Sequence, residues 1–160
     1  GKMCSGKSFV AIKLSEEYQA KIFSFAEKIK EIARDLFNMQ EKNRELLQVL
    51  GKNMRDIDNN VWIDYLLRKT ENLSNVIIDD IRYPNELKAL RDNGFIIFKL
   101  TIPEEERIER IKNTYPNNYQ KHLERLNHES EMHITKLDAD YTILSNSNTI
   151  DTIQNLLKLS

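Results

Sequence analysis

The sequence has little of several features that particular classes of protein need. It contains a single cysteine, Cys4, which cannot form an internal disulfide, so nothing in it argues for secretion. No apolar run is long enough to cross a bilayer, and the N-terminal residues lack the basic-then-apolar pattern of a secretory signal. The formal net charge of -1 gives no broad attraction to nucleic acid. These shortages predict a cytoplasmic protein that binds neither a membrane nor nucleic acid.

What the chain does have is enough apolar material for one core. It is 160 residues long, a length typical of one domain, with 40% hydrophobic and 31% charged residues. Short apolar runs alternate with longer amphipathic stretches, which indicates an α/β fold with a parallel sheet flanked by helices. We therefore expect a single domain over residues 1–160.

The alternating runs place the elements of this fold along the chain. The predicted strands are residues 21–25, 75–79, 95–100 and 141–144. The predicted helices are residues 7–18, 26–37, roughly 44–68, 84–92, 104–112, 119–127 and 149–157. Pro84 suits a first helical turn, where its missing N–H is not needed, and Gly94 suits the end of the same helix.

The segment 101–133 differs from the rest of the chain. It is rich in charge, lacks a strand pattern and lies between two predicted strands. A long polar helical insertion at such a place in an α/β domain is typical of a lid. Arg107 and Arg110 are spaced three residues apart on its first helix, so both can face one ligand. We expect at least one arginine of the segment, Arg107, Arg110 or Arg125, to contact phosphate, and the first two are favoured.

The first eight residues match the phosphate-binding pattern G-x-x-x-x-G-K-[ST] at every fixed position. In this pattern the glycines let successive N–H groups point at one phosphate, the lysine approaches the β- and γ-phosphates, and the serine hydroxyl binds Mg²⁺. The helix that follows adds the positive end of its dipole. The predicted donor-phosphate residues are Gly1, Lys2, Met3, Cys4, Ser5, Gly6, Lys7 and Ser8.

A phosphate loop of this kind normally follows a strand, and here it starts at Gly1. The rest of the sequence favours a first strand that belongs upstream and is absent from this chain. Inside the loop, we interpret Cys4 as a small residue that fits the turn.

Acidic residues follow the predicted strand 75–79, at the end of a strand where α/β sheets bind ligands. Asp79 and Asp80 are candidates to hold Mg²⁺ or its water, and the pattern does not distinguish between them. Arg82, just beyond them, carries a guanidinium that can grip a phosphate with two hydrogen bonds. Asn85 and Glu86 are interpreted as caps of the helix that follows.

Several segments in order resemble one family across almost the whole chain. They are GKMCSGKS, FSFAEKIKEIARDLF, RELLQVLGKNMRDIDNNVWIDYL, VIIDDIRYPNEL, GFIIFKL, HESE and ILSNSNTIDTI. Together they resemble the deoxynucleoside monophosphate kinases of bacteriophages and large DNA viruses, within the P-loop nucleoside monophosphate kinase group. The run DDIRYPNE and the element HESE are the most specific parts of the resemblance.

The resemblance implies a P-loop kinase fold with acceptor-binding helices over about residues 38–70 and a mobile lid over residues 101–133. It implies acceptor-binding roles for Arg44, Arg55 and Arg82. Glu131 and His128 lie in HESE, and two roles stay open for them, orienting the lid or touching substrate; Glu131 is taken as an acceptor-binding candidate. The donor base is expected beside a loop made of Ser145, Asn146, Ser147 and Asn148.

Three further side chains are interpreted as structural. Trp62 lies in an apolar helical stripe, where packing in the core is favoured over stacking on a base. His122 and His133 have no neighbouring cysteine or carboxylate spacing that suggests zinc, so they are interpreted as structural or surface residues.

The sequence as a whole predicts ATP-dependent phosphorylation of a nucleoside monophosphate, with Lys7, Asp79, Asp80, Arg82, Arg107 and Arg110 as catalytic residues. Mg²⁺ is expected to bind through Ser8 and Asp79, and no covalent intermediate on the protein is needed. The expected partners are nucleotide substrates, and a second copy of the chain is a candidate partner. Two alternatives remain open: a P-loop kinase of another small phosphorylated metabolite, and a nucleotide-binding module without catalysis.

Overall fold

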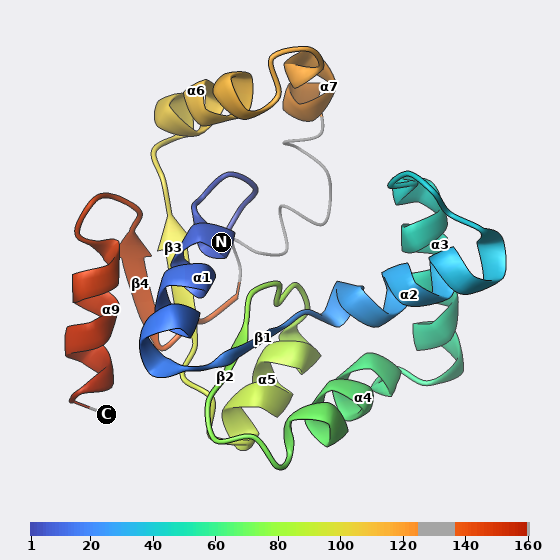
Figure 1. The fold of residues 1–160 in the computed structure, drawn as a ribbon, viewed down its shortest axis with the longest axis horizontal. Coiled ribbons are helices and arrows are strands. Elements are labelled where there is room, and N and C mark those ends of the chain that lie inside the picture. Colours follow the sequence, from blue (N-terminus) through green and yellow to red (C-terminus); the bar gives the residue numbers. More distant parts are fainter. Residues whose placement is uncertain (125–136, 160) are drawn as a thin grey trace. The chain divides into compact units, whose positions relative to one another are not determined.

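A computed structural model describes residues 1–124 and 137–159 of the chain. Helices and short strands alternate through most of it (Figure 1). The elements are α1 (Lys7–Tyr18), β1 (Lys21–Phe23), α2 (Phe25–Phe37), α3 (Arg44–Ile57), α4 (Val61–Thr70), β2 (Val76–Ile78), α5 (Pro84–Asp92), β3 (Phe98–Thr101), α6 (Glu104–Thr114), α7 (Tyr119–Glu124), β4 (Tyr141–Leu144) and α9 (Thr149–Leu157).

The chain divides into two compact units. Unit 1 consists of Gly1–Leu14 and Arg82–Ser160, and unit 2 is the segment between them, Ser15–Ile81. Unit 1 therefore contains the phosphate loop, the start of α1, and every element from α5 onwards. Unit 2 contains β1, β2 and the helices α2, α3 and α4, which include most of the segment expected to bind the acceptor.

Each unit contains one parallel pair of strands. In unit 2, β1 pairs with β2, with Lys21 opposite Val76. In unit 1, β3 pairs with β4, with Phe98 opposite Tyr141. The α/β fold and the parallel pairing are thus confirmed, but the described strands form two two-stranded sheets and not one continuous sheet.

The core of unit 1 is built from one face of each surrounding helix. In Figure 1, β3 and β4 lie side by side and α9 runs next to β4. Leu100 of β3, Ile143 of β4 and Ile153 of α9 are all buried. The helices α1 and α5 add buried leucine, valine and alanine side chains to this core.

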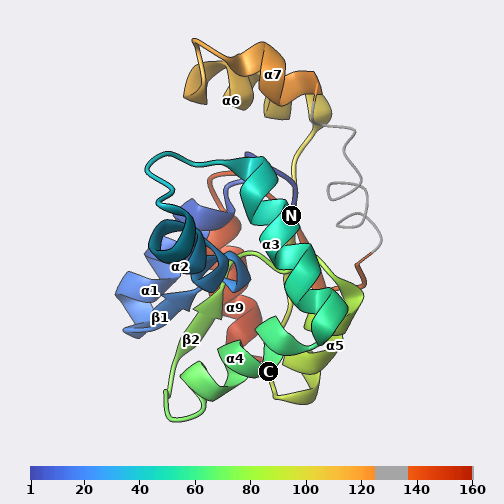
Figure 2. The same cartoon turned by 90° about the vertical axis from the view of Figure 1, so that its right-hand side faces the viewer.

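Unit 2 is mainly a cluster of three helices, which Figure 2 shows gathered together. Gly51 of α3 is buried, and a Cβ atom there would lie 3.2 Å from Cδ1 of Ile29 on α2. Trp62 of α4 is 4% exposed, and its indole N–H donates to the carbonyl of Gly51 at 3.2 Å. The close approach of α2 and α4 to α3 thus depends on the absence of a side chain at Gly51. The interpretation of Trp62 as a core residue is confirmed.

The single helix predicted for residues 44–68 is wrong, because the chain leaves the helical conformation at Asp58. This residue is extended, with φ -144° and ψ 113°, and it separates α3 from α4. Its carboxylate accepts a hydrogen bond from the N–H of Asn60 at 2.9 Å. Such a local side-chain bond competes with the helical hydrogen-bond pattern and favours a turn.

The other boundaries differ from the predictions by a few residues. The strand predicted for residues 21–25 ends at Phe23, because Ser24 is the N-cap of α2 and Phe25 is its first residue. The strand predicted for residues 95–100 starts only at Phe98. The helices α1, α5 and α9 and the strand β4 have the predicted bounds.

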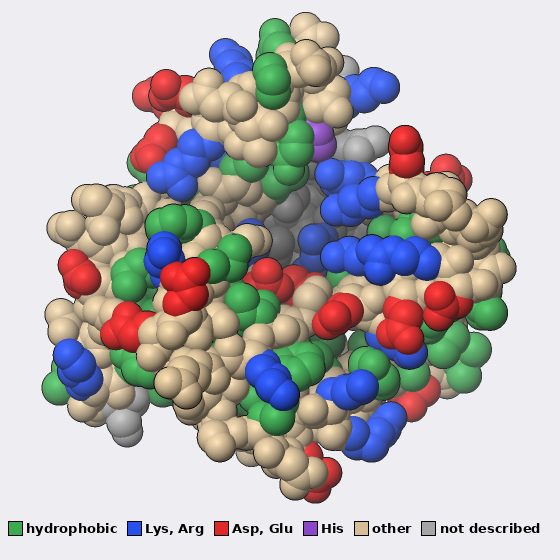
Figure 3. All heavy atoms as spheres, in the orientation of Figure 1, with side chains coloured by type: hydrophobic (Ala, Val, Ile, Leu, Met, Phe, Trp, Pro, Cys, Tyr) green, Lys and Arg blue, Asp and Glu red, His purple; other side chains and the backbone are tan. Residues whose placement is uncertain are grey.

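The surface carries both signs of charge. Figure 3 shows acidic and basic side chains interspersed on the visible face, including the part over α6 and α7. This mixture agrees with the near-zero net charge of the sequence. Within residues 1–124 and 137–159, no helix is both long enough and apolar enough to cross a membrane.

Candidate functional site

The phosphate loop has the backbone conformation that an anion site needs. Cys4 and Gly6 both have left-handed φ angles, 60° and 86°, with Ser5 between them. Alternation of right- and left-handed residues turns successive N–H groups toward one side of the chain, where they form a concave anion-binding nest. Immediately afterwards α1 begins at Lys7, and its first turn contains no acidic residue that would neutralise the positive helix end.

Two glycines allow the loop to lie close to its surroundings. At Gly1 a Cβ atom would lie 2.5 Å from the carbonyl oxygen of Leu100 and 2.5 Å from Oγ of Ser5. At Gly6 it would lie 3.0 Å from Oγ of Ser145. The pattern of the motif therefore has a steric reason here, because larger residues at Gly1 and Gly6 would displace the end of β3 and the loop after β4.

The side chain of Lys7 lies over the loop itself. Its ammonium donates to the carbonyl of Lys2 at 2.6 Å, and the N–H of Ser5 donates to the same carbonyl at 3.3 Å. Ser5 is fully buried, so its side chain does not face a ligand. The ammonium of Lys7 thus lies at the loop, and the donor-phosphate role of the loop residues stays a prediction.

Arg107 reaches the loop from α6. Its side chain is 1% exposed, and Nε donates to the carbonyl of Met3 at 3.1 Å. Its Nη1 contacts both carboxylate oxygens of Glu104, at 3.2 and 3.3 Å. The carboxylate of Glu104 also lies 4.0 Å from the ammonium of Lys2. The structure thus places Arg107 against the backbone of the phosphate loop, buried from solvent.

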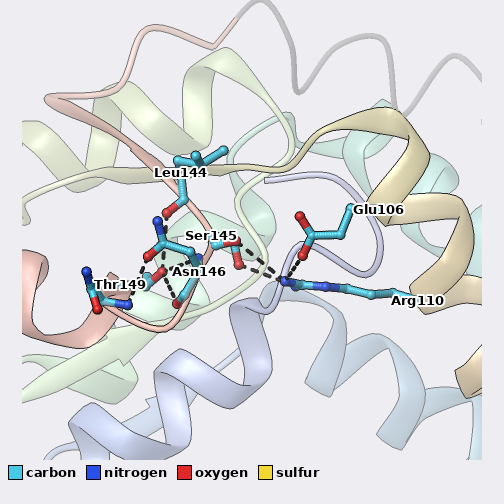
Figure 4. Close-up of polar contacts among 7 residues, drawn as sticks. Glu106, Arg110, Leu144, Ser145, Asn146 and Thr149 are labelled. Carbon is cyan, nitrogen blue, oxygen red and sulfur yellow. Dashed lines mark hydrogen bonds and ion pairs between the residues drawn. The ribbon is translucent and has the colours of Figure 1, made fainter.

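Arg110 lies one helical turn further along α6 and faces the loop after β4 (Figure 4). Its Nη2 forms an ion pair with Glu106 at 2.6 Å, and Nη1 lies 3.4 Å from Oγ of Ser145. A Cβ atom at Gly6 would lie 3.7 Å from Nη1. Arg110, the phosphate loop and the predicted donor-base loop are therefore brought together in unit 1.

The donor-base loop is held by its own hydrogen bonds. The N–H of Asn146 donates to Oγ1 of Thr149 at 2.8 Å, and the N–H of Asn148 donates to Oδ1 of Asn146 at 2.9 Å. Oγ of Ser147 lies 3.2 Å from Oδ1 of Asn148. These local bonds fix the turn between β4 and α9, and Figure 4 shows part of this network.

A family model described as an AAA domain matches residues 1–136, which is most of the chain. The chain belongs to this AAA domain family. The match identifies a P-loop NTPase-like domain and supports a nucleotide-utilising enzyme, of the kind that generally binds ATP with Mg²⁺. A search of curated proteins found no match to the sequence.

In this AAA domain the two neighbouring aspartates have different surroundings. Both oxygens of Asp80 accept hydrogen bonds at the N-terminus of α2, from Oγ of Ser24 at 2.6 Å, N of Phe25 at 2.8 Å and N of Ala26 at 3.0 Å. The carboxylate therefore accepts hydrogen bonds from N–H groups of the first turn, which have no carbonyl acceptor within the helix. Asp80 is a cap for α2, and the role of Asp79 as a metal ligand stays a prediction.

Arg82 and Glu86 lie at the start of α5 in unit 1. Glu86 is 4% exposed and accepts from the backbone N–H of Arg82 at 2.8 Å and of Tyr83 at 3.1 Å. The interpretation of Glu86 as a helix cap is confirmed. The residue Arg82 is exposed, so its guanidinium can reach a ligand without leaving a buried position. Its acceptor role stays a prediction.

The acceptor candidates on α3 share one side of that helix. Arg55 lies eleven positions after Arg44, which is about three helical turns, so the two residues lie on nearly the same face. The guanidinium of Arg55 lies over the surface of Gly51, since a Cβ atom there would be 3.5 Å from Nη2. Both arginines are half-buried. Their position fits a shared binding face, and their role in binding an acceptor stays a prediction.

The two predicted metal ligands belong to different units, Ser8 to unit 1 and Asp79 to unit 2, and their joint role stays a prediction. Ser8 is exposed at the start of α1, and Asp79 follows β2, so each offers the hard oxygen that Mg²⁺ prefers. In the described part of the chain, no group of three or more histidine, cysteine or acidic side chains is arranged to hold a metal ion. A site completed by nucleotide phosphates and water is the kind that Mg²⁺ adopts with so few protein ligands.

Some predicted residues lie outside the described residues, and others were missed. His128, Glu131 and His133 belong to the part of the chain that the structure does not describe. His122 is 7% exposed with its ring stacked on Tyr115 at 4.1 Å between centroids, so its structural interpretation is confirmed. The sequence reasoning missed Glu104 and Glu106 as partners of the α6 arginines, although their spacings of three and four residues were a readable signal.

Proposed function

We propose that the protein transfers the γ-phosphoryl group of ATP to a nucleoside monophosphate, with deoxynucleotides preferred. The observation that carries the proposal is the phosphate loop, with left-handed Cys4 and Gly6, the ammonium of Lys7 and the guanidinium of Arg110 gathered around it. The identity of the acceptor rests on the resemblance to deoxynucleoside monophosphate kinases.

In this proposal the protein works by positioning and by charge neutralisation. The N–H groups of the loop bind the donor phosphates, and Lys7 exchanges the carbonyl of Lys2 for a phosphate oxygen. Arg110 can leave Glu106 for the donor because it is only partly buried, with 34% of its side chain exposed. The loop of Ser145 to Asn148 lies beside it and borders the donor base.

The acceptor is assigned to a separate set of cations. Arg82 grips its phosphate with a planar fork, and Arg44 and Arg55 of α3 bind the rest of the nucleotide. Ser8 and Asp79 would hold Mg²⁺, which supplies charge neutralisation at the phosphates when it is bound. The segment 101–133 excludes water that would otherwise hydrolyse the donor.

The test is an assay of the full-length protein with ATP and a panel of acceptors. The panel contains deoxy- and ribonucleoside monophosphates and phosphorylated metabolites without a base, and chromatography detects the product. We expect diphosphate formation only with nucleotides and faster transfer to deoxynucleotides. Transfer confined to other metabolites would contradict the acceptor assignment, and ATP binding without any transfer would indicate a non-catalytic module.

A further inference from the structure

We propose that Arg107 is a positioning residue that holds the phosphate loop in its anion-binding conformation. It does so through the carbonyl of Met3, to which its Nε donates at 3.1 Å. The inference concerns the affinity for the donor nucleotide and in that respect rests on the proposed function. It assigns Arg107 a task different from the direct phosphate contact that the sequence predicts.

The argument starts from the backbone of the loop. When the N–H groups of a nest point inward to one phosphate, the carbonyl groups between them point away from it. A buried carbonyl without a donor is costly, so each outward carbonyl needs a partner. The carbonyl of Lys2 receives the N–H of Ser5 and the ammonium of Lys7, and the carbonyl of Met3 receives Arg107.

The bond of Arg107 differs from that of Lys7 in one respect that matters for function. Lys7 must release the carbonyl of Lys2 when it turns to the phosphates, whereas Arg107 is 1% exposed and has no free path to a ligand. Its charge is balanced by Glu104, which contacts Nη1 at 3.2 and 3.3 Å. Arg107 can therefore keep hold of Met3 before and after the nucleotide binds.

The bond from Arg107 to the carbonyl of Met3 lies next to a residue with a strained backbone conformation. Cys4, directly after Met3, has a φ of 60°, a left-handed conformation that is unfavourable for a residue with a side chain. Such a conformation persists only when the surroundings enforce it. A charge-assisted hydrogen bond to the neighbouring carbonyl is a suitable restraint, because it fixes the peptide group between Met3 and Cys4.

The experiment compares three variants with the wild type. Arg107→Met keeps most of the volume and removes the donor, Arg107→Lys keeps a charged donor, and Lys112→Gln removes a positive charge from an exposed site on the same helix. Titration with a fluorescent ATP analogue gives the donor affinity, and steady-state assays give kcat and KM for each substrate. Hydrogen exchange without nucleotide reports on the amides of residues 2–8.

We expect Arg107→Met to weaken ATP binding about 10- to 100-fold, the effect of losing a hydrogen bond to a charged group. Arg107→Met should also show faster hydrogen exchange at residues 2–8 and an unchanged KM for the acceptor. The ATP affinity and loop exchange of Arg107→Lys should be intermediate, and those of Lys112→Gln should match the wild type. Wild-type ATP affinity and loop exchange in a folded Arg107→Met protein would overturn the inference.

The remaining outcomes are also decisive. An equal loss of donor and acceptor affinity together with a lower Tm would show a merely structural role and overturn the proposal. If Arg107→Met does not fold, Arg107→Lys decides: weaker ATP binding at a native Tm supports the inference, and unchanged binding contradicts it. A wild type that binds ATP but transfers to no acceptor would sink the proposed function, while loop exchange and ATP affinity still test Arg107.

Discussion

Lys7, whose ammonium lies 2.6 Å from the carbonyl of Lys2, is the residue on which the proposed donor chemistry depends most directly. Lys7→Ala should lower the rate of transfer by about 10²–10³ or more, as expected when a preorganised charge at a reacting phosphate is lost. The fold should survive, because the loop keeps its other bonds. Circular dichroism and turnover check this, with Lys88→Ala on the exposed side of α5 as the control. Near-normal turnover would remove Lys7 from the donor site.

Cys4 is the one residue of the loop whose side chain opposes its backbone conformation. Cys4→Gly relieves a left-handed cost of about 1–2 kcal/mol but adds about 0.5–1 kcal/mol of chain entropy, so it should raise stability by up to about 1.5 kcal/mol. Cys4→Val should lower stability, because β-branching is least compatible with this φ. Urea unfolding measures both. Destabilisation by glycine would mean that the thiol makes contacts that outweigh the strain.

Asp79 and Asp80 form a matched pair for separating stability from activity. Asp80→Ala removes the acceptor of Ser24 and of two backbone N–H groups, and should cost about 1–2 kcal/mol of unfolding free energy. Asp79→Ala should abolish Mg²⁺-dependent transfer if Asp79 holds the metal ion. Urea unfolding and turnover, measured on both variants, give the comparison. The reverse pattern would make Asp80 the metal ligand.

The residues that the sequence could predict are those defined by local spacing. The phosphate loop follows from eight consecutive residues, and the cap at Glu86 follows from its place three residues after Tyr83. The role of Asp80 could not be predicted, because its partner Ser24 lies 56 residues away in sequence. The burial of Arg107 likewise depends on a contact with Met3 across 104 residues, which no local pattern encodes.

At the scale of elements, the boundaries that could be predicted are those marked by a proline or a glycine. α5 begins at Pro84 and ends before the positive-φ Gly94, and both ends agree with the prediction. The break after α3 was missed because Asp58 ends the helix without a glycine or proline to mark it. The signal present here is an aspartate, Asp58, whose carboxylate accepts from the N–H of Asn60 two residues later. This signal is weaker, and the periodic helical pattern of the surrounding residues obscures it.

In residues 101–124, the described part of the segment predicted as a lid, the helices α6 and α7 have different attachments. α6 is tied to the phosphate loop by Arg107, whereas the contacts of α7 are mainly with α6. We therefore expect the amides of α6 to be protected from hydrogen exchange without ligand, and those of α7 to gain protection only with a bisubstrate analogue. Equal protection of α7 with and without the analogue would indicate a fixed insertion. Ligand-dependent protection that extends through α6 would indicate a lid that moves as a whole.

For the whole molecule, the sequence predicted the α/β class and parallel pairing, and the match to an AAA domain agrees with it. The division into two compact units was not predicted. Strands of three or four residues have too few side chains for their sequence to specify which strand they pair with. The pairing of β1 with β2 therefore depends on the helices between them. The arrangement of strands was therefore beyond what periodicity could give.

The division into units leads to a prediction about the two substrates. The donor residues, namely the phosphate loop, Arg110 and the loop after β4, belong to unit 1, whereas Arg44 and Arg55 belong to unit 2. A non-hydrolysable ATP analogue should slow hydrogen exchange at residues 1–8 and 145–148, and a deoxynucleoside monophosphate should slow it in α3. Each ligand, at 100 times its Kd, should stabilise the folded protein by about 2.7 kcal/mol.

The variants that check this assignment are Arg44→Ala and Arg82→Lys. Arg44→Ala should remove the protection of α3 by the acceptor and leave the protection by the ATP analogue intact. Arg82→Lys keeps the charge but loses the planar pair of donors. The resulting loss of binding free energy, calculated from the change in acceptor KM or in turnover, should be about 1.5–3 kcal/mol, the value of a hydrogen bond to a charged group. An acceptor that protects only unit 1 would exclude Arg44 and Arg55 as its ligands. Weaker ATP binding alone in Arg82→Lys would place that arginine on the donor side.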